Sequence, residues 1–499
     1  MRLPLEENGS DCLKLIYDDR LSMEESVEAV IPDAYADATQ ILDVRGTSLF
    51  LGKRVMPDSV AVSAAVEADV IFATEDSDAP KCVSVRLPFE FSSIAKGVGE
   101  GSEMTVLLEL PKLEAKLLNP RKALIRAETA ANVKAYENQV FTLWDAADSE
   151  DESGVYTLRG ELEFALTTAL GEKNFTVSDE YLLPTELGGA QLVSAVTRLA
   201  VDEVKAVGAR LVFKATAHSD VLFMTHEGAP ASSHFETQFS QIIEVGTEAE
   251  EAQVDIILSI AGTDFVLLLD ANRSVLAANI KVFAQAVLTE KKHASYVADA
   301  YSNDYKLELK KERLGLSSET VSGKQRLRLS GELNGANAEE IVCFNCGSVS
   351  AHIDGGHIVF SARGSGLGKT DEGCVIPLSA KLTGEENFEL EANETLRVRN
   401  ICCGGARRGE RDRIEVDITY EIIICAEEPE EVVSGIETDT DAPISRDSRP
   451  SLTVLCSEKQ ASLWDIAKKY GSSIKAIEEA NSLCGEFDER VRPLLVPKV

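Results

Sequence analysis

Long stretches of this chain alternate between apolar and polar residues, which is the period of a β-strand with one buried face. The clearest are residues 122–135, 274–285 and 413–422, and the last of them alternates almost without a break. Alternation of this kind buries one face of a strand and leaves the other in solvent. We therefore expect antiparallel β-structure over most of the chain.

A short signature recurs along the alternating part of the chain. An aspartate two residues before a tyrosine occurs in 31–35, 177–181 and 297–301, at a spacing of roughly 120–150 residues, which is the size of a domain. The motif is either a docking epitope or, more simply, a boundary strand with a packed tyrosine and a turn-forming aspartate. The repeats predict three related β-rich modules, which cover residues 12–145, 155–292 and 293–426.

The composition changes after the third predicted module. Residues 427–450 contain about eight acidic side chains and three prolines, without any hydrophobic period. A segment with so little apolar content does not recover the entropy that it loses on ordering. We therefore expect a flexible acidic linker over 427–450.

The last 49 residues predict a small unit with the order β-α-α-β. An apolar strand over 452–456 precedes a helix over 462–471, in which Ser462 is the N-cap, Asp465 completes a capping box and Gly471 ends the helix. A second helix begins after Ser473 and ends near 481, and residues 494–497 form a closing strand.

The string from Ser462 to Asn481, with its Leu-Trp-x-Ile-Ala core and Tyr-Gly stop, resembles the lysin motif (LysM) family. In glycan-binding members of that family the loop before the first helix reads Gly-Asp-Thr, whereas this chain has Gln-Ala-Ser. Trp464 can be read either as a partner anchor or as a core residue of a small domain. The resemblance implies a partner-binding or glycan-binding groove made of Lys459, Gln460, Ala461, Ser462, Trp464, Ser472, Ser473, Ile474 and Asn481.

The segment 117–122, Leu-Leu-Asn-Pro-Arg-Lys, resembles the closing motif of the SPOCS domain family of spore-coat morphogenetic proteins, and the later copies depart from it. Three such domains followed by a LysM unit resemble the proteins that tether the coat to the forespore in Clostridia. The resemblance implies a non-enzymatic scaffold in the mother-cell cytosol, whose LysM unit binds the coat-basement ATPase alongside other coat proteins. The alternative is a protein that binds peptidoglycan through the LysM groove.

Charge and hydropathy narrow the choice of partners. The chain of 499 residues has 84 acidic and 50 basic side chains, a formal net charge of −34, and 44% hydrophobic residues. This excess of negative charge repels the phosphates of nucleic acids, so we expect no nucleic-acid partner. No apolar run is long enough for a secretion signal or a transmembrane segment, which predicts a cytoplasmic protein.

Candidate chemistry is sparse. Cys343, Cys346, Cys402 and Cys403 are the candidates for a zinc site, but reduced thiols buried on strands are the simpler interpretation. The glycine-rich segment 364–370 lacks the spacing of a phosphate-binding loop and is expected to form a turn at a hairpin tip. We find no constellation of acid, base or nucleophile, and therefore predict no catalytic activity, no metal and no cofactor.

Overall fold

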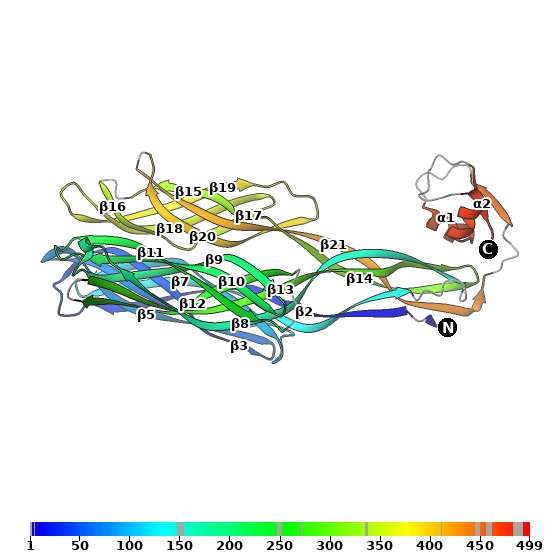
Figure 1. Cartoon of the computed structure of the whole chain (residues 1–499), viewed down its shortest axis with the longest axis horizontal. Coiled ribbons are helices and arrows are strands. Elements are labelled where there is room, and N and C mark those ends of the chain that lie inside the picture. Colours follow the sequence, from blue (N-terminus) through cyan, green and yellow to red (C-terminus); the bar gives the residue numbers. More distant parts are fainter. Residues whose placement is uncertain are drawn as a thin grey trace.

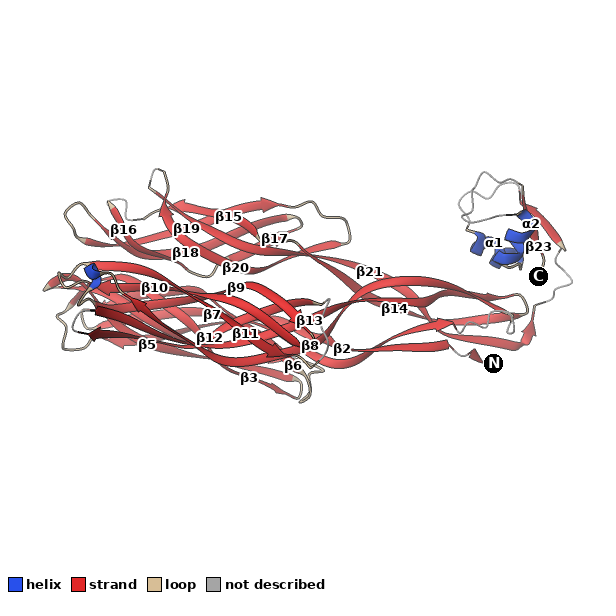
Figure 2. Ribbon diagram, in the orientation of Figure 1, coloured by secondary structure: helices blue, strands red, loops and turns tan. Residues whose placement is uncertain are grey.

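The computed structural model describes residues 2–3, 5–146, 154–246, 252–270, 273–334, 338–410, 412–444, 450–455, 462–482 and 493–499. Figure 1 shows a strand-rich body, in which β15 to β20 form a layer of their own, and a narrower stalk of strands that leads from the body towards a small C-terminal unit. Figure 2 shows that strands make up nearly all of the regular structure. The prediction of a mainly β, multi-unit chain is confirmed.

The first unit, residues 5–146, consists of two three-stranded antiparallel sheets. One sheet has the order β2-β7-β6 and the other the order β3-β4-β5. Apolar residues from both sheets, among them Val66 and Val133, form one fully buried core. The strands are β2 (Leu5–Val30), β3 (Ala38–Met56), β4 (Ser59–Thr74), β5 (Ser77–Ile94), β6 (Glu103–Asn119) and β7 (Lys122–Ala146).

The middle unit, residues 155–302, has the same strand order. Its sheets run β8-β13-β12 and β9-β10-β11, so in each unit the first strand pairs with the last. The elements are β8 (Val155–Leu182), the short 3-10 helix η1 (Thr185–Leu187), β9 (Gln191–Val207), β10 (Arg210–Met224), β11 (Pro230–Glu244), β12 (Gln253–Asp270) and β13 (Arg273–Ser302).

The third unit, residues 305–443, follows the same plan with interrupted strands. Here β14 and β15 pair with successive parts of β21, as one broken first strand would, and β18 lies between β19 and the pair β16 and β17. β20 pairs with β21, and the short β1 (Arg2–Leu3) adds to the end of β21. The strands are β14 (Tyr305–Val321), β15 (Gln325–Glu332), β16 (Glu340–Cys346), β17 (Ser350–Asp354), β18 (His357–Lys369), β19 (Val375–Asn387), β20 (Glu394–Arg408) and β21 (Arg413–Pro443).

A buried apolar residue directly after the first strand marks the same point in all three units. Each donates its backbone N–H to a carbonyl at the start of the unit's last strand, which fixes the turn out of the first sheet. The bonds run from Ile31 to Arg121, from Leu183 to Ser274 and from Leu333 to Asp412, at 2.9, 2.9 and 2.8 Å.

The aspartate-tyrosine signature gives a different alignment, and its third copy is misplaced. The copies at 31–35 and 177–181 lie at or just after the end of a first strand, but 297–301 lies in β13, the last strand of the middle unit. Because β13 continues without a break to Ser302, the module boundary predicted between 292 and 293 divides a single strand and is wrong.

The stalk consists of three two-stranded ribbons, formed where β2 pairs with β7, β8 with β13 and β14 with β21 (Figure 1). Each ribbon contributes to one buried cluster, in which Leu143, Phe164, Tyr296 and Val432 pack together. A single two-stranded ribbon is marginally stable in water, so the three ribbons depend on one another for burial.

Residues 427–443 complete the stalk, which corrects the predictions of a flexible linker that begins at 427 and of a third module that ends at 426. Residues 445–449 of the linker predicted over 427–450 lie outside the described part of the chain. β21 continues to Pro443, and Val432, Val433 and Ile436 are fully buried. Glu431 and Glu437 lie on the outer side, where Lys310, Lys311 and Arg313 of β14 pair with them. The few apolar residues of this segment suffice because the other two ribbons supply the surface that they bury.

The C-terminal unit has the predicted order of elements. β22 (Leu452–Leu455) and β23 (Leu494–Pro497) form an antiparallel pair, and α1 (Leu463–Tyr470) and α2 (Ile474–Asn481) lie between them in the sequence. The capping box and the left-handed Gly471 that ends α1 are confirmed. Within the described part of the chain, no helix is long and apolar enough to cross a membrane.

Candidate functional site

Trp464 of α1 packs against the tip of the stalk. Its ring meets the Tyr301 ring edge to face, with centroids 4.8 Å apart and planes at 69°. Its indole Nε1 donates a hydrogen bond to the carboxylate of Asp299 at 2.9 Å. Trp464 also belongs to the core of the C-terminal unit, together with Ile466 and Ile477. It is therefore a core residue that also contacts the rest of the chain.

Asp299 receives a second donor from α1. The ammonium of Lys468 forms an ion pair with the same carboxylate oxygen that accepts from Trp464. Burial raises the pKa of Asp299, but the hydrogen bonds from Lys468 and Trp464 outweigh this effect and hold the pKa below the ordinary 3.8. The contact thus favours an ionised Asp299.

The loop between α1 and α2 makes the other half of the contact. The carbonyl oxygen of Ser472, a fully buried residue, accepts hydrogen bonds from the Tyr301 hydroxyl at 2.8 Å and from Asn303 Nδ2 at 3.2 Å. Burial raises the pKa of Tyr301, so its hydroxyl remains a donor at neutral pH. We call Asp299, Tyr301, Asn303, Trp464, Lys468 and Ser472 together the docking contact.

Three other residues of the predicted groove stabilise the C-terminal unit itself. Ser462 Oγ accepts from the N–H of Asp465 and Ser473 Oγ from the N–H of Ala476, both at 3.1 Å, so each serine caps a helix. Ile474 packs against the unit's core. Their roles in the described fold are structural.

Asn481 connects α2 to the closing strand β23. Its side-chain amide donates to the carbonyls of Ile477 and Leu495 at 2.7 and 2.6 Å, and accepts from the N–H of Leu495 at 2.7 Å. An amide with three such bonds is committed to the fold. The remaining predicted groove residues lie outside the described part of the chain: Lys459, Gln460 and Ala461.

The docking contact should weaken in acid. Because the pKa of Asp299 is lowered in the docked state, its contribution is complete above the ordinary value of 3.8 and is lost as the pH falls through the lowered value. The chain has two tryptophans, so a Trp144→Phe background leaves Trp464 as a fluorescent reporter of docking. We expect its emission to shift to the red on acidification. The Asp299→Asn variant should lack this titration, and an identical titration in both proteins would contradict the assignment.

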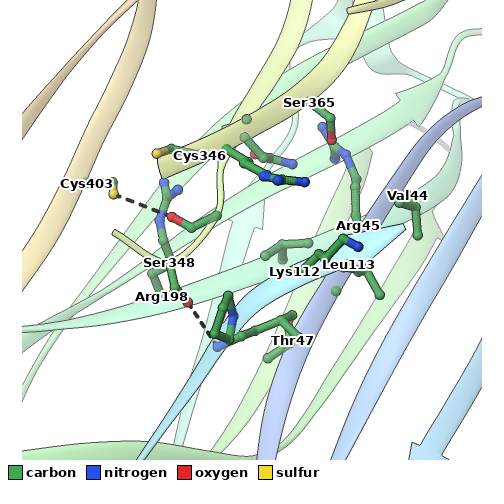
Figure 3. A pocket seen from close by; sticks show the side chains of 18 of the residues that line it. Val44, Arg45, Thr47, Lys112, Leu113, Arg198, Cys346, Ser348, Ser365 and Cys403 are labelled. Carbon is green, nitrogen blue, oxygen red and sulfur yellow. Dashed lines mark hydrogen bonds between the residues drawn. The ribbon is translucent and has the colours of Figure 1, made fainter. Parts of the chain in front are cut away.

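A cavity of about 830 Å³ lies where the three units meet, with lining residues from each (Figure 3). Arg45 is 3% exposed there and pairs with Asp43 at 3.2 Å, while its Nη1 has no hydrogen-bond partner among the described residues. Within the same part of the chain Arg198 has an unpartnered Nε and pairs with Asp220 at 2.7 Å. Guanidinium donors of this kind suit a carboxylate or phosphate.

The cysteines near this cavity do not gather as a metal site. Cys346 is buried on β16, and Cys343, Cys402 and Cys403 are partly buried on β16 and β20. Among the described residues, no three of these thiols lie close enough to share an ion. A hydrogen bond between Cys346 and Cys403 lowers the pKa of Cys403 and raises that of Cys346.

The glycine-rich segment is a strand, so the prediction of a turn at 364–370 is wrong. Residues up to Lys369 lie in β18, hydrogen-bonded to β16 on one side and β19 on the other. A Cβ on Gly366 would lie 2.0 Å from the carbonyl oxygen of Cys343. The glycine therefore allows the close approach of β16.

No protein-family model matches this chain, and the curated proteins and the solved structures contain no match to it either.

Proposed function

We propose that this protein is a non-enzymatic scaffold whose C-terminal unit captures a partner protein. The observation that carries this proposal is the docking contact, in which the face around Trp464 and Ser472 already binds polypeptide groups: a carboxylate, a tyrosine and an asparagine amide. A face that recognises these groups within the chain is suited to recognise them on another protein.

The rest of the chain suits a rigid support. Ile71, Leu222 and Leu367, from the central strands β4, β10 and β18 of the three units, form one fully buried cluster. Side-chain hydrogen bonds also cross between the units: Ser194 to Asp69 at 2.7 Å, Ser365 to Asp43 at 2.6 Å and Ser232 to the carbonyl of Val342 at 2.5 Å. Three units joined in this way hold their outer surfaces in fixed relation, as an assembly platform requires.

The partners in this proposal follow from the resemblance of the chain to the SPOCS and LysM families. We propose that the partner of the C-terminal unit is the ATPase at the base of the spore coat, that the β units hold other coat proteins, and that this happens around the forespore in the mother cell. The alternative partner is peptidoglycan. The docking contact favours a protein partner, because it combines a carboxylate, a phenol and a carboxamide, and peptidoglycan contains no phenol.

A partner that uses this face must first displace the stalk. An Asp299→Arg variant opposes Lys468 with a like charge and removes the acceptor of Trp464, so it should release the C-terminal unit while leaving the strand in place. Asp179→Arg is the matched control, because Asp179 occupies the same signature on β8 and forms no hydrogen bond or ion pair with the described residues of the C-terminal unit.

The test compares retention of the full chain on the immobilised ATPase and on insoluble peptidoglycan. We expect binding to the ATPase, stronger for Asp299→Arg than for the wild type and unchanged for Asp179→Arg, and no retention on peptidoglycan. Retention on peptidoglycan alone would overturn the scaffold proposal in favour of the alternative. Equal binding of the ATPase by all three proteins would place its site elsewhere on the chain.

A further inference from the structure

Two histidines and two carboxylates occupy one face of the β10–β11 pair in the middle unit. In the antiparallel register His218 lies opposite Glu236, and Asp220 lies opposite His234. Residues two apart on a strand share a face, and directly opposed residues are close neighbours. The four side chains therefore form a compact quartet, and His218 also lines the cavity where the three units meet.

Three donor atoms of this quartet form a nearly equilateral triangle. The distances are 3.4 Å from His218 Nδ1 to His234 Nε2, 3.4 Å from His218 Nδ1 to Glu236 Oε1 and 3.4 Å from His234 Nε2 to Glu236 Oε1. These separations exceed the 2.7–3.2 Å or so of good hydrogen bonds. Tetrahedral zinc with Zn–N bonds of about 2.0–2.1 Å separates its donor atoms by about 3.3–3.4 Å, which is the spacing found here.

The surroundings orient one of these imidazoles for metal binding. Asp220 Oδ1 lies 2.8 Å from His234 Nδ1, and its other oxygen accepts from Arg198 at 2.7 Å. An Nδ1–H that donates to Asp220 leaves the lone pair of His234 Nε2 directed at the triangle. Metal-bound histidines characteristically have such a carboxylate on the other ring nitrogen, where it fixes the tautomer.

We propose that His218, His234 and Glu236 bind a divalent transition-metal ion of the zinc class, with Asp220 as the positioning residue. Two imidazole nitrogens and one carboxylate oxygen suit Zn²⁺ better than Mg²⁺ or Ca²⁺, which require oxygen ligands. Three protein ligands leave the fourth tetrahedral position open to water or to a donor from a bound partner. Among the described residues, this is the one group of three such side chains with donor atoms within 4.8 Å of one another.

The site is accessible from solvent. The side chains of His218, His234 and Glu236 are 29%, 44% and 55% exposed, so an ion can enter without opening the fold. The same exposure makes substitutions here tolerable to the fold, because surface changes usually alter stability little. If a variant loses metal binding, the cause is therefore the loss of a metal-ligating side chain and not unfolding.

The test is equilibrium dialysis of the metal-free full chain against Zn²⁺, with Co²⁺ absorption as a probe of tetrahedral geometry. We expect His234→Ala to lose one equivalent of zinc together with the tetrahedral Co²⁺ spectrum. Asp220→Asn should keep the equivalent with an affinity about 10-fold to 100-fold weaker. Zinc bound by cysteines elsewhere is common to all these proteins and cancels in the comparison.

His357→Ala is the matched control, because His357 is a partly exposed strand histidine that pairs with Asn387. It should bind zinc as the wild type does, and circular dichroism should show all variants folded. The same stoichiometry, affinity and Co²⁺ spectrum in His234→Ala as in the wild type would overturn the proposal. Failure of the wild type to bind Zn²⁺ at micromolar concentration would overturn it as well.

Discussion

Replacing Val433 by aspartate should unfold the stalk. Val433 is fully buried in a cluster with Val155, Val297 and Ile436, where a carboxylate would be withdrawn from water among apolar side chains. A buried, unpaired charge is among the few single changes that cost about 4 kcal/mol or more. Urea denaturation should show this loss, and limited proteolysis should show early cleavage in the stalk.

The matched control is Val30→Asp. Val30 is 63% exposed at the end of β2 and lies opposite Lys122, so the same substitution there meets solvent and a basic neighbour. We expect a change within about 0.5 kcal/mol. If Val433→Asp were as mild as the control, residues 427–443 would behave as the flexible linker that the sequence alone suggests.

The sequence could not predict this part of the stalk because its burial comes from other segments. In residues 427–443, the three apolar residues that become buried stand among many acidic ones. Local composition alone therefore predicts a solvated tail. The ribbon that β21 forms with β14 packs on two further ribbons, whose strands come from the first and middle units. The few valines and the isoleucine are sufficient to order this segment only because the other two ribbons provide the surface against which they are buried.

Local patterns were reliable where the cause is local. Alternation identified the strands β7, β13 and β21, and the capping residues set the ends of α1 and α2. The signature predicts a repeat but misaligns its third copy, because a two-residue signature also recurs by chance. The true repeated feature, a backbone bond from Ile31, Leu183 or Leu333, leaves no mark in the sequence beyond one apolar residue.

The candidate sites show the same limit. Trp464 stands out in the sequence, yet nothing there indicates that Asp299 and Tyr301 are its neighbours, since they lie more than 160 residues away on another unit. His218 and His234 fit no metal motif, because their proximity depends on the register between β10 and β11. The sequence signal for this metal site is a histidine two residues before a glutamate on a strand, as in 234–236. It indicates a site only when the histidine on the facing strand is known.

Replacing Gln285 by leucine should uncouple the first and middle units. Gln285 is fully buried, and its side-chain amide pairs with the backbone of Val106 on β6, with Nε2 donating to the carbonyl at 2.7 Å and Oε1 accepting from the N–H at 3.0 Å. The side-chain amide of Gln285 thus makes the two hydrogen bonds to Val106 that a neighbouring β-strand would make. Leucine preserves volume and removes both of these bonds, together with the one that Oε1 accepts from Lys53 Nζ at 3.1 Å. Two backbone groups are then left unsatisfied, at about 1–3 kcal/mol each.

Urea denaturation should show a loss of about 2–4 kcal/mol, and hydrogen exchange should locate it at the N–H of Val106 on β6. Gln139→Leu on the exposed part of β7 is the matched control and should change neither measurement. The stacked rings of Phe50 and Phe283, 4.5 Å apart, also join these units. If Gln285→Leu left stability and exchange unchanged, such apolar contacts alone would hold the units together, and the buried amide would be dispensable for the scaffold's rigidity.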